Sequence, residues 1–259
     1  NHDLNNKVNL LIDSSGIKKN HDMIKRREVK NKFKTIITHT YDKADFHIIF
    51  GVNEKKYDKK KHNIISSSIC DAVAIGPVIN LIDKYFKIKN GSITTLHPWL
   101  GYQNLMDGPS RSFAYPGKNI ENFALGRAST ETLIPKRTSC VDALIESMPS
   151  IKNKFISMSV RVPTQIVSSA IINLNLENKV NNSLVLMKIR NFIKKQKNDI
   201  ISLSNDQCVS KDFISNKYSL IIDQRWLETK DNNLRLFIWY DNEYGYSSRV
   251  LDLINNLNK

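Results

Sequence analysis

The chain of 259 residues, 41% of them hydrophobic, is long enough to bury the core of one large domain or two smaller ones. No apolar run approaches the roughly 20 residues of a membrane-spanning helix, and no secretory signal precedes the first polar stretch, so we expect a cytoplasmic protein without a membrane partner. The net charge of +14 comes from lysines spread along the chain; without a basic-aromatic ladder or finger spacing, it favours a solvated surface or an anion pocket over nucleic-acid binding.

Short β-branched runs dominate the first part of the chain. The runs at 8–13, 34–38 and 46–52 are bounded by polar residues or glycine and predict buried strands. A helix is expected at 21–32, between the first two runs. Because strand and helix alternate, this part predicts a parallel sheet.

The stretch that follows changes to a helical period. From Pro77 to Phe86, apolar residues recur at spacings of three and four, which predicts an amphipathic helix that Cys70 opens. Gly91 then marks the return to a strand at 92–97.

The second half predicts a mixed sheet with helices. Strict alternation at 168–178 indicates a strand with one buried and one solvated face. A helix is expected at 182–196 with Ser183 as its N-cap, followed by a strand at 234–240 and a last helix at 248–257. The chain is therefore of the α/β class.

Three cysteines, Cys70, Cys140 and Cys208, are too few and too scattered for a disulfide framework or a zinc site. We expect no metal, and we interpret Cys140 and Cys208 as packing residues. Cys70 is either a third packing thiol or a reactive one.

Three further stretches decide between these interpretations of Cys70: TTLHPW at 94–99, SVRVPTQIVS at 159–168 and WYDNEYGYSSRV at 239–250. Each resembles a signature of the glyceraldehyde-3-phosphate dehydrogenases and the related erythrose-4-phosphate dehydrogenases. In that family a proline follows the reactive cysteine by seven residues and the catalytic histidine follows it by 27, where Pro77 and His97 stand here. The resemblance covers essentially the whole chain.

The resemblance implies a domain organisation. Residues 1–69 would be the second half of an NAD(P)-binding domain, a partial Rossmann-type parallel sheet. Residues 70–241 would form an α+β catalytic domain with a mixed, largely antiparallel sheet. Residues 242–259 would be a C-terminal helix that returns to the first domain.

The resemblance also implies a reaction, in which Cys70 attacks a phosphorylated aldehyde, hydride passes to NAD or NADP, and inorganic phosphate cleaves the thioester. A free thiol has a pKa of about 8.5, and a helix N-terminus and an imidazole stabilise its thiolate. His97 would be the base and would then stabilise the oxyanion. The alternative for His97 is a hydrogen-bonded strand histidine.

Binding residues carry over from the same motifs. Thr138 and Arg161 would hold phosphate, because a guanidinium fork suits its oxygens and a hydroxyl adds a donor; Arg161 is alternatively a surface ion-pair residue. The residues expected at the cofactor are Asn242, Tyr246, Ser14, Ser15, Gly16 and Thr38. For Asn242 and Tyr246 the alternatives are a structural turn and a core aromatic. A homotetramer is expected from the family.

The first departure from the family is an absence. The opening strand and the G-F-G-R-I-G turn, which seat a dinucleotide, have no counterpart, and roughly 80 residues of the pattern are missing. We therefore expect a fragment of a longer protein, with the missing half cleaved or on another chain. A naturally shortened, cofactor-free protein is the alternative.

The second departure surrounds the nucleophile. Ile69 and Asp71 replace the family's Ser and Thr, Leu100 and Tyr102 replace polar residues after the histidine, and Ser139 replaces a glycine. A carboxylate beside the thiol raises the thiol pKa and repels phosphate. The missing glycine turn and the changes at Ile69 and Asp71 motivate a rival hypothesis, a non-catalytic scaffold or anion-binding protein that kept the fold and lost the coenzyme. Under this alternative, oxidation of erythrose 4-phosphate and arsenate-linked chemistry would be variant activities.

Overall fold

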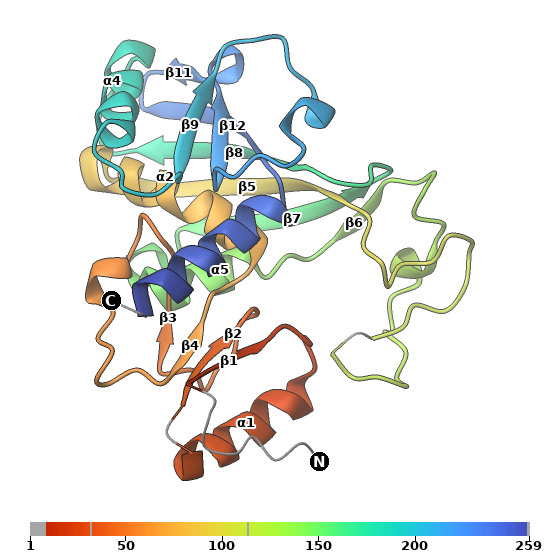
Figure 1. Ribbon diagram of the computed structural model, residues 1–259. Coiled ribbons are helices and arrows are strands. Elements are labelled where there is room, and N and C mark those ends of the chain that lie inside the picture. The colour runs from red at the N-terminus through yellow and green to blue at the C-terminus, as the bar shows by residue number, and fades with distance from the viewer. Residues whose placement is uncertain (1–8, 32, 113, 258–259) are drawn as a thin grey trace.

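The computed structural model describes residues 9–31, 33–112 and 114–257. A small parallel sheet with helix α1 lies at one end of the molecule, a larger mixed sheet lies at the other, and helices α2 and α5 lie between them (Figure 1). One hydrophobic core connects the three parts, since Ile36 and Ile65 of the small sheet belong to the same buried cluster as Ile79 of α2 and Leu236 of the large sheet. No helix of the described residues is long and apolar enough to cross a bilayer.

The small sheet confirms the predicted parallel α/β arrangement. Its strands, in spatial order, are β1 (Leu10–Asp13), β2 (Lys34–Ile37), β4 (Ile64–Ser66) and β3 (Phe46–His47). Helix α1 (Lys18–Asn31) connects β1 to β2, which are hydrogen-bonded neighbours. Val8 and Lys32, which the sequence assigned to the first strand and first helix, lie outside the described residues.

The predicted strand at 46–52 is wrong beyond His47. The side chain of Asn53 accepts a hydrogen bond from the Ile49 amide at 2.9 Å and donates one to the His47 carbonyl at 2.7 Å. These bonds hold the backbone in a turn, which Gly51 completes at a φ of +83°. A short 3₁₀ turn, Glu54–Lys56, follows.

Helix α2 (Cys70–Phe86) follows the small sheet directly and runs through the core. Twelve of its 17 residues are buried. Over residues 77–86 the buried positions are apolar and the polar residues Asn80, Asp83 and Lys84 are not buried, which confirms the predicted amphipathic helix. Its first turn carries Cys70 and Asp71, and the preceding Ile69 supplies no side-chain cap. Helix α2 therefore holds the candidate nucleophile on a rigid element.

The large sheet contains eight strands. Along the main path they are β6 (Ile134–Lys136), β7 (Phe155–Val162), β5 (Ile88–Pro98), β8 (Ser168–Leu176), β12 (Asn233–Tyr240), β10 (Leu220–Asp223) and β9 (Ile201–Ser204), while β11 (Glu228–Lys230) pairs with β12. The pairs β5–β7 and β9–β10 are parallel and the other pairs are antiparallel. The mixed, largely antiparallel sheet was predicted.

Strand β5 begins earlier than the sequence suggested, because Gly91 lies inside it. A side chain at that position would meet the Asn173 carbonyl oxygen at 2.6 Å, so glycine permits the close approach of β8. The register between the two strands shifts between Ile88 and Asn90. Strand β5 ends with His97 and Pro98.

Three more helices complete the fold: α3 (Cys140–Ser147), α4 (Asn182–Ile193) and α5 (Tyr244–Leu257). The predicted cap of α4 is wrong, since Asn181, not Ser183, caps the helix by accepting a hydrogen bond from the Leu184 amide at 2.8 Å. The described residues between β5 and β6, 99–112 and 114–133, extend away from the rest of the molecule (Figure 1).

Candidate active site

Cys70 stands where the chain passes from β4 into α2. Ser66 donates a hydrogen bond through Oγ to the His39 carbonyl at 2.7 Å and accepts one from the Ser68 amide at 3.1 Å. Ser68 has a φ of +62°, an unfavourable value for a serine. The tight turn brings the half-buried Cys70 to the start of the helix.

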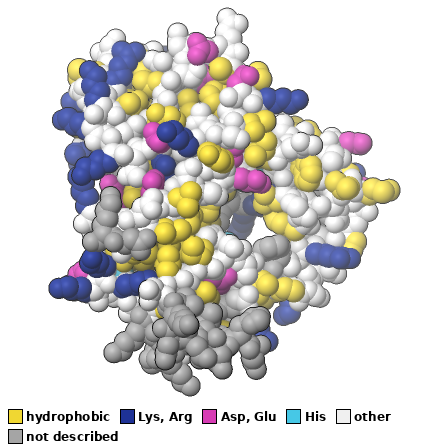
Figure 2. Space-filling view, in the orientation of Figure 1, with side chains coloured by type: hydrophobic (Ala, Val, Ile, Leu, Met, Phe, Trp, Pro, Cys, Tyr) yellow, Lys and Arg dark blue, Asp and Glu magenta, His cyan; other side chains and the backbone are white. Residues whose placement is uncertain are grey.

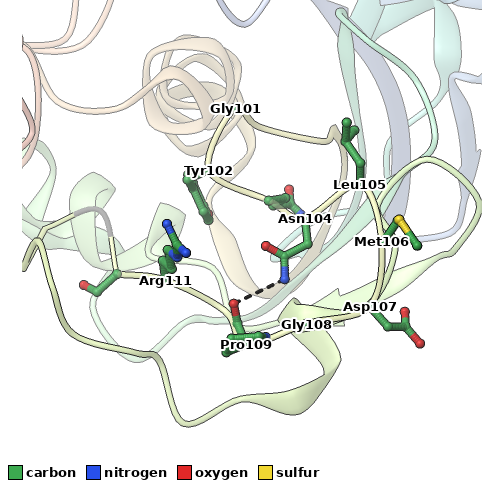
Figure 3. A pocket seen from close by; sticks show the side chains of 11 residues that line it. Gly101, Tyr102, Asn104, Leu105, Met106, Asp107, Gly108, Pro109 and Arg111 are labelled. Atoms are coloured by element: carbon green, nitrogen blue, oxygen red, sulfur yellow. Dashed lines mark hydrogen bonds between the residues drawn. The ribbon is translucent and has the colours of Figure 1, made fainter.

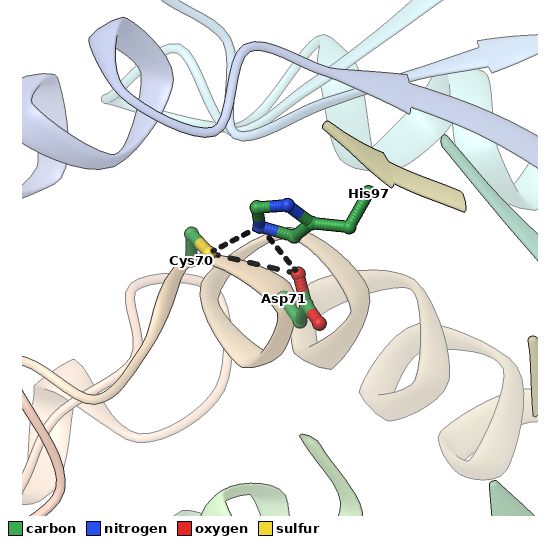
Figure 4. Close-up of side chains that lie close together, drawn as sticks. All are labelled: Cys70, Asp71 and His97. Carbon is green, nitrogen blue, oxygen red and sulfur yellow. Dashed lines mark hydrogen bonds and ion pairs between the residues drawn. The ribbon is translucent and has the colours of Figure 1, made fainter. Parts of the chain in front are cut away.

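His97 faces Cys70 from strand β5 (Figure 4). Its Nε2 lies 3.6 Å from the Cys70 Sγ, and its Nδ1 lies 2.8 Å from the Pro98 carbonyl oxygen. A carbonyl oxygen only accepts, so Nδ1 carries the proton and donates. The neutral ring then presents the lone pair of Nε2 to the thiol.

Asp71 is the third member of this group (Figure 4). Its Oδ1 lies 3.6 Å from the Cys70 Sγ and 3.9 Å from the His97 Nε2. The same oxygen accepts a hydrogen bond from the Tyr240 hydroxyl at 2.8 Å, at the end of β12. Sequence reasoning noticed Asp71 but missed Tyr240, which is 169 residues away along the chain.

Burial, and then the charge of Asp71, raise the pKa of the Cys70 thiol well above its ordinary value. Burial also lowers the pKa of His97; Arg161 acts in the same direction, and Asp71 opposes them. These directions oppose the stabilisation expected from the helix N-terminus and the imidazole, and they agree with the effect expected of the Asp71 carboxylate. Both shifts favour a neutral thiol beside a neutral imidazole.

Arg161 lies directly opposite His97 in the register of β7 and β5. Its side chain is only 5% exposed, which excludes the alternative of a surface ion-pair residue. Its NH1 donates to the Pro98 carbonyl at 3.4 Å, and its Nε is buried with no partner among the described residues. A buried guanidinium with unused donors is suited to bind an anion.

Thr138 lies beyond β6, just before α3, where its hydroxyl accepts a hydrogen bond from the Cys140 amide at 3.1 Å. Lys136, two residues earlier on β6, is half-buried, and sequence reasoning missed it. Burial and Arg161 lower the pKa of Lys136, while Asp71 and Cys70 act against them. The signal in the sequence that could have identified Lys136 was its position two residues before Thr138, in the same stretch.

Two candidate cofactor residues lie at the start of α5 or just before it, and one of them contacts the segment before Cys70. Tyr246 on α5 shares a hydrogen bond with the Ser67 hydroxyl at 2.7 Å and donates one to the Ser68 carbonyl at 3.2 Å. Asn242 is 8% exposed, and its Oδ1 has no hydrogen-bond partner among the described residues. A buried acceptor of this kind fits the N–H donor of a nicotinamide carboxamide.

Ser15, Gly16 and Thr38 follow the carboxyl ends of β1 and β2, the edge at which parallel sheets bind ligands. Asp13 organises this edge: its Oδ1 accepts from the Ser15 amide at 2.9 Å and its carbonyl accepts from the Thr38 amide at 3.0 Å. Gly16 has a φ of +65°, and Ser14 is exposed. These hydrogen bonds do not involve Cys70 or His97.

Cys70, Asp71 and His97 offer one donor atom each, all within 4.8 Å of one another, a set that could hold a metal ion. The sequence expectation of no metal site considered the cysteines alone. Arg161 and Lys136 act electrostatically on this group and oppose a bound cation.

The surface is hollowed near the middle of one face, where basic side chains are visible inside the hollow (Figure 2). A cavity of about 580 Å³ lies within residues 101–112, where the Asn104 side chain donates to the Pro109 carbonyl at 3.2 Å (Figure 3). Tyr102 and Arg111 line it; the candidate catalytic residues do not.

A family model described as "Glyceraldehyde 3-phosphate dehydrogenase, C-terminal domain" matches residues 69–242. Glyceraldehyde-3-phosphate dehydrogenase 1 of Kluyveromyces marxianus is 29% identical over 96% of this chain and 73% of its own length. Glyceraldehyde-3-phosphate dehydrogenase 2 of Bacillus subtilis is 31% identical over 86% of the chain and 63% of its own length. The testis-specific enzyme of Mus musculus is 33% identical over 80% of the chain, which spans 45% of that relative.

Proposed function

This chain belongs to the glyceraldehyde-3-phosphate dehydrogenase family, and on that premise we propose that the protein oxidises a phosphorylated aldehyde through a covalent bond to Cys70. One observation carries the proposal: the His97 Nε2, kept free of its proton by the Nδ1–Pro98 hydrogen bond, lies 3.6 Å from the Cys70 sulfur. A base within this reach can remove the thiol proton as the sulfur attacks.

The first step forms a carbon–sulfur bond. The Cys70 sulfur adds to the aldehyde carbon, and its proton passes through the His97 Nε2 to the aldehyde oxygen. The product is a thiohemiacetal on Cys70. Because the resting thiol is neutral, proton removal by His97 and attack by sulfur are coupled.

Oxidation of the thiohemiacetal requires a hydride acceptor. When bound, NAD or NADP would accept the hydride from the thiohemiacetal carbon. His97 takes the hydroxyl proton as the hydride leaves, and the thioester remains on Cys70. The Asn242 Oδ1 would hold the carboxamide of the nicotinamide, and Tyr246 would support that side of the site. Ser15, Gly16 and Thr38 would contact the rest of the dinucleotide.

Phosphorolysis ends the cycle. An oxygen of inorganic phosphate attacks the thioester carbon, the carbon–sulfur bond breaks, and the sulfur takes back its proton from His97. Arg161 and Thr138 would hold the phosphate groups. Residues 1–69 would complete the cofactor domain, residues 70–241 would be the catalytic domain and 242–259 the returning helix. The proposal includes a homotetramer in the cytoplasm.

Substitution of the nucleophile tests this function. In the full protein with NAD or NADP, phosphate and glyceraldehyde 3-phosphate, Cys70→Ser should abolish cofactor reduction. Turnover of the variant at the wild-type rate would rule the proposal out. Size-exclusion chromatography with light scattering measures the oligomeric state of the same preparation.

A non-catalytic, anion-binding scaffold is the second candidate, and Asp71 is the observation that favours it. The carboxylate raises the pKa of Cys70 instead of activating it. Alkylation by iodoacetamide near neutral pH separates the two functions. If Cys70 reacts no faster than Cys140 and Cys208, the thiol is not activated and the scaffold is favoured.

A further inference from the structure

Two cations lie on the same face of the large sheet as His97. Arg161 is paired in register with His97 on one side and with Ile134 of β6 on the other. Lys136 is two residues beyond Ile134, so both side chains leave β6 on the same face. Lys136 is paired with Ser159, whose hydroxyl accepts a hydrogen bond from the Thr95 Oγ1 at 2.9 Å. Lys136 and Arg161 are therefore diagonal neighbours.

The position of β6 gives Lys136 access to solvent. It is the edge strand of the sheet, and Lys136 is half-buried, whereas Arg161 on the next strand is 5% exposed. An anion that enters from this edge meets the ammonium group first and the buried guanidinium behind it. The Arg161 Nε donor has no protein partner among the described residues.

The charges of this group do not balance. Arg161 and Lys136 are both positive, His97 rests neutral, and Asp71 supplies the negative charge. The Asp71 carboxylate is itself engaged by the Tyr240 hydroxyl at 2.8 Å. Two partly desolvated cations repel each other, and a bound anion removes this unfavourable energy.

We propose that Lys136 completes, with Arg161, a two-cation site that binds a phosphoryl oxyanion beside Cys70. A tetrahedral dianion matches both groups, since the guanidinium donates two parallel hydrogen bonds and the ammonium contributes a point charge. Thr138 supports the site, because its hydroxyl accepts from the Cys140 amide and keeps its own proton to donate. Lys136 thus sets the specificity for a phosphorylated reactant in the reaction proposed above, on which the assignment to catalysis rests.

Calorimetric titration of the full protein with inorganic phosphate tests the site directly. Lys136→Met keeps the apolar stem, removes the charge and should weaken phosphate binding about tenfold or more. Lys136→Arg should restore most of the affinity. Arg137→Met is the matched control, because Arg137 is the exposed neighbour and its loss changes the net charge equally. Equal affinities of Lys136→Met and Arg137→Met, with both folded by their melting temperatures, would overturn the proposal.

Kinetics distinguish the two sources of the anion. A higher KM for inorganic phosphate alone in Lys136→Met assigns the site to the free co-substrate. A higher KM for glyceraldehyde 3-phosphate, without a change for unphosphorylated glyceraldehyde, assigns it to the phosphoryl group of the substrate. A fall in kcat with every KM unchanged contradicts the assignment of Lys136 to anion binding.

The binding experiment also separates this inference from the proposed dehydrogenase. If the wild-type protein oxidises no aldehyde but loses phosphate affinity in Lys136→Met, the anion site stands and the dehydrogenase function fails. If the wild type is active and Lys136→Met binds phosphate normally, only the anion site fails.

Discussion

Two helices of this chain begin in the same way and have different surroundings. Helix α2 begins with Cys70 and carries Asp71 in its first turn, and helix α3 begins with Cys140 and carries Asp142 there. Neither helix has a side-chain hydrogen bond from its N-cap residue. Burial raises the pKa of both thiols.

The two helices differ in what surrounds their first residue. Cys140 is fully buried in the hydrophobic core, while Cys70 is half-buried and faces the imidazole of His97 at 3.6 Å. Both thiols lie at a helix N-terminus, so that position does not distinguish them. In the proposed function, His97 on strand β5 would take the proton of Cys70.

The largest expected effect comes from removing the two thiols in turn. Cys70→Ser should lower kcat for aldehyde oxidation by more than about a thousandfold, as expected for loss of a nucleophile. Cys140→Ala should leave kcat within about twofold and lower the free energy of unfolding by about 1 kcal/mol. Cofactor absorbance measures kcat, and denaturant titration measures the free energy of unfolding. Comparable losses of kcat in the two variants would contradict the proposed difference between Cys70 and Cys140.

The next effect concerns the base that distinguishes Cys70. His97→Asn should lower kcat by about 10²- to 10⁴-fold, because the thiol proton then has no acceptor on β5. The Cys70 alkylation rate should fall towards that of Cys140. Initial-rate kinetics and mass-spectrometric alkylation report both. An unchanged Cys70 alkylation rate in His97→Asn would mean that Nε2 does not take the proton.

A smaller effect is expected from the two first-turn aspartates. The Asp71 charge raises the pKa of Cys70, so Asp71→Asn should lower that pKa and increase the thiolate fraction at neutral pH. The pH profile of Cys70 alkylation should move to lower pH, with severalfold faster reaction at pH 7. Asparagine keeps an acceptor for the Tyr240 hydroxyl.

Asp142→Asn on α3 is the control for this change. Asp142 is exposed and lies in the first turn of α3, as Asp71 lies in the first turn of α2. The Asp142→Asn variant should leave the Cys70 profile unchanged. A profile that moves to higher pH in Asp71→Asn has the wrong sign and excludes the electrostatic explanation.

The sequence predicted those features that depend on local pattern. Alternating strands and helices gave the parallel sheet, and the 27-residue interval from Cys70 to His97 fits a helix followed by a strand that returns beside its start. The failures are also local in origin. The side chain of Asn53 ends strand β3 early by bonding to His47 and Ile49, and an apolar pattern carries no trace of such bonds.

The remaining site residues depend on contacts between distant segments. Tyr240 reaches Asp71 across 169 residues, and Lys136 joins Arg161 only through the register of β6 with β7. The pKa of Cys70 also depends on such contacts, because burial is the largest cause that raises it and the sequence does not specify that burial.

The smallest expected effect concerns the N-cap of helix α4, which carries no candidate site residue. Unlike α2 and α3, helix α4 has a side-chain cap, since Asn181 accepts from the Leu184 amide at 2.8 Å. Asn181→Ala should lower the free energy of unfolding by about 1 kcal/mol. Ser183→Ala, at the exposed residue first expected to be the cap, should change it by less than about 0.5 kcal/mol. Urea titration of both variants measures this difference, and a larger loss in Ser183→Ala would return the cap to Ser183. If instead both variants lose nothing, capped and uncapped helix starts in this fold are equivalent, and the bare start of α2 needs no functional explanation.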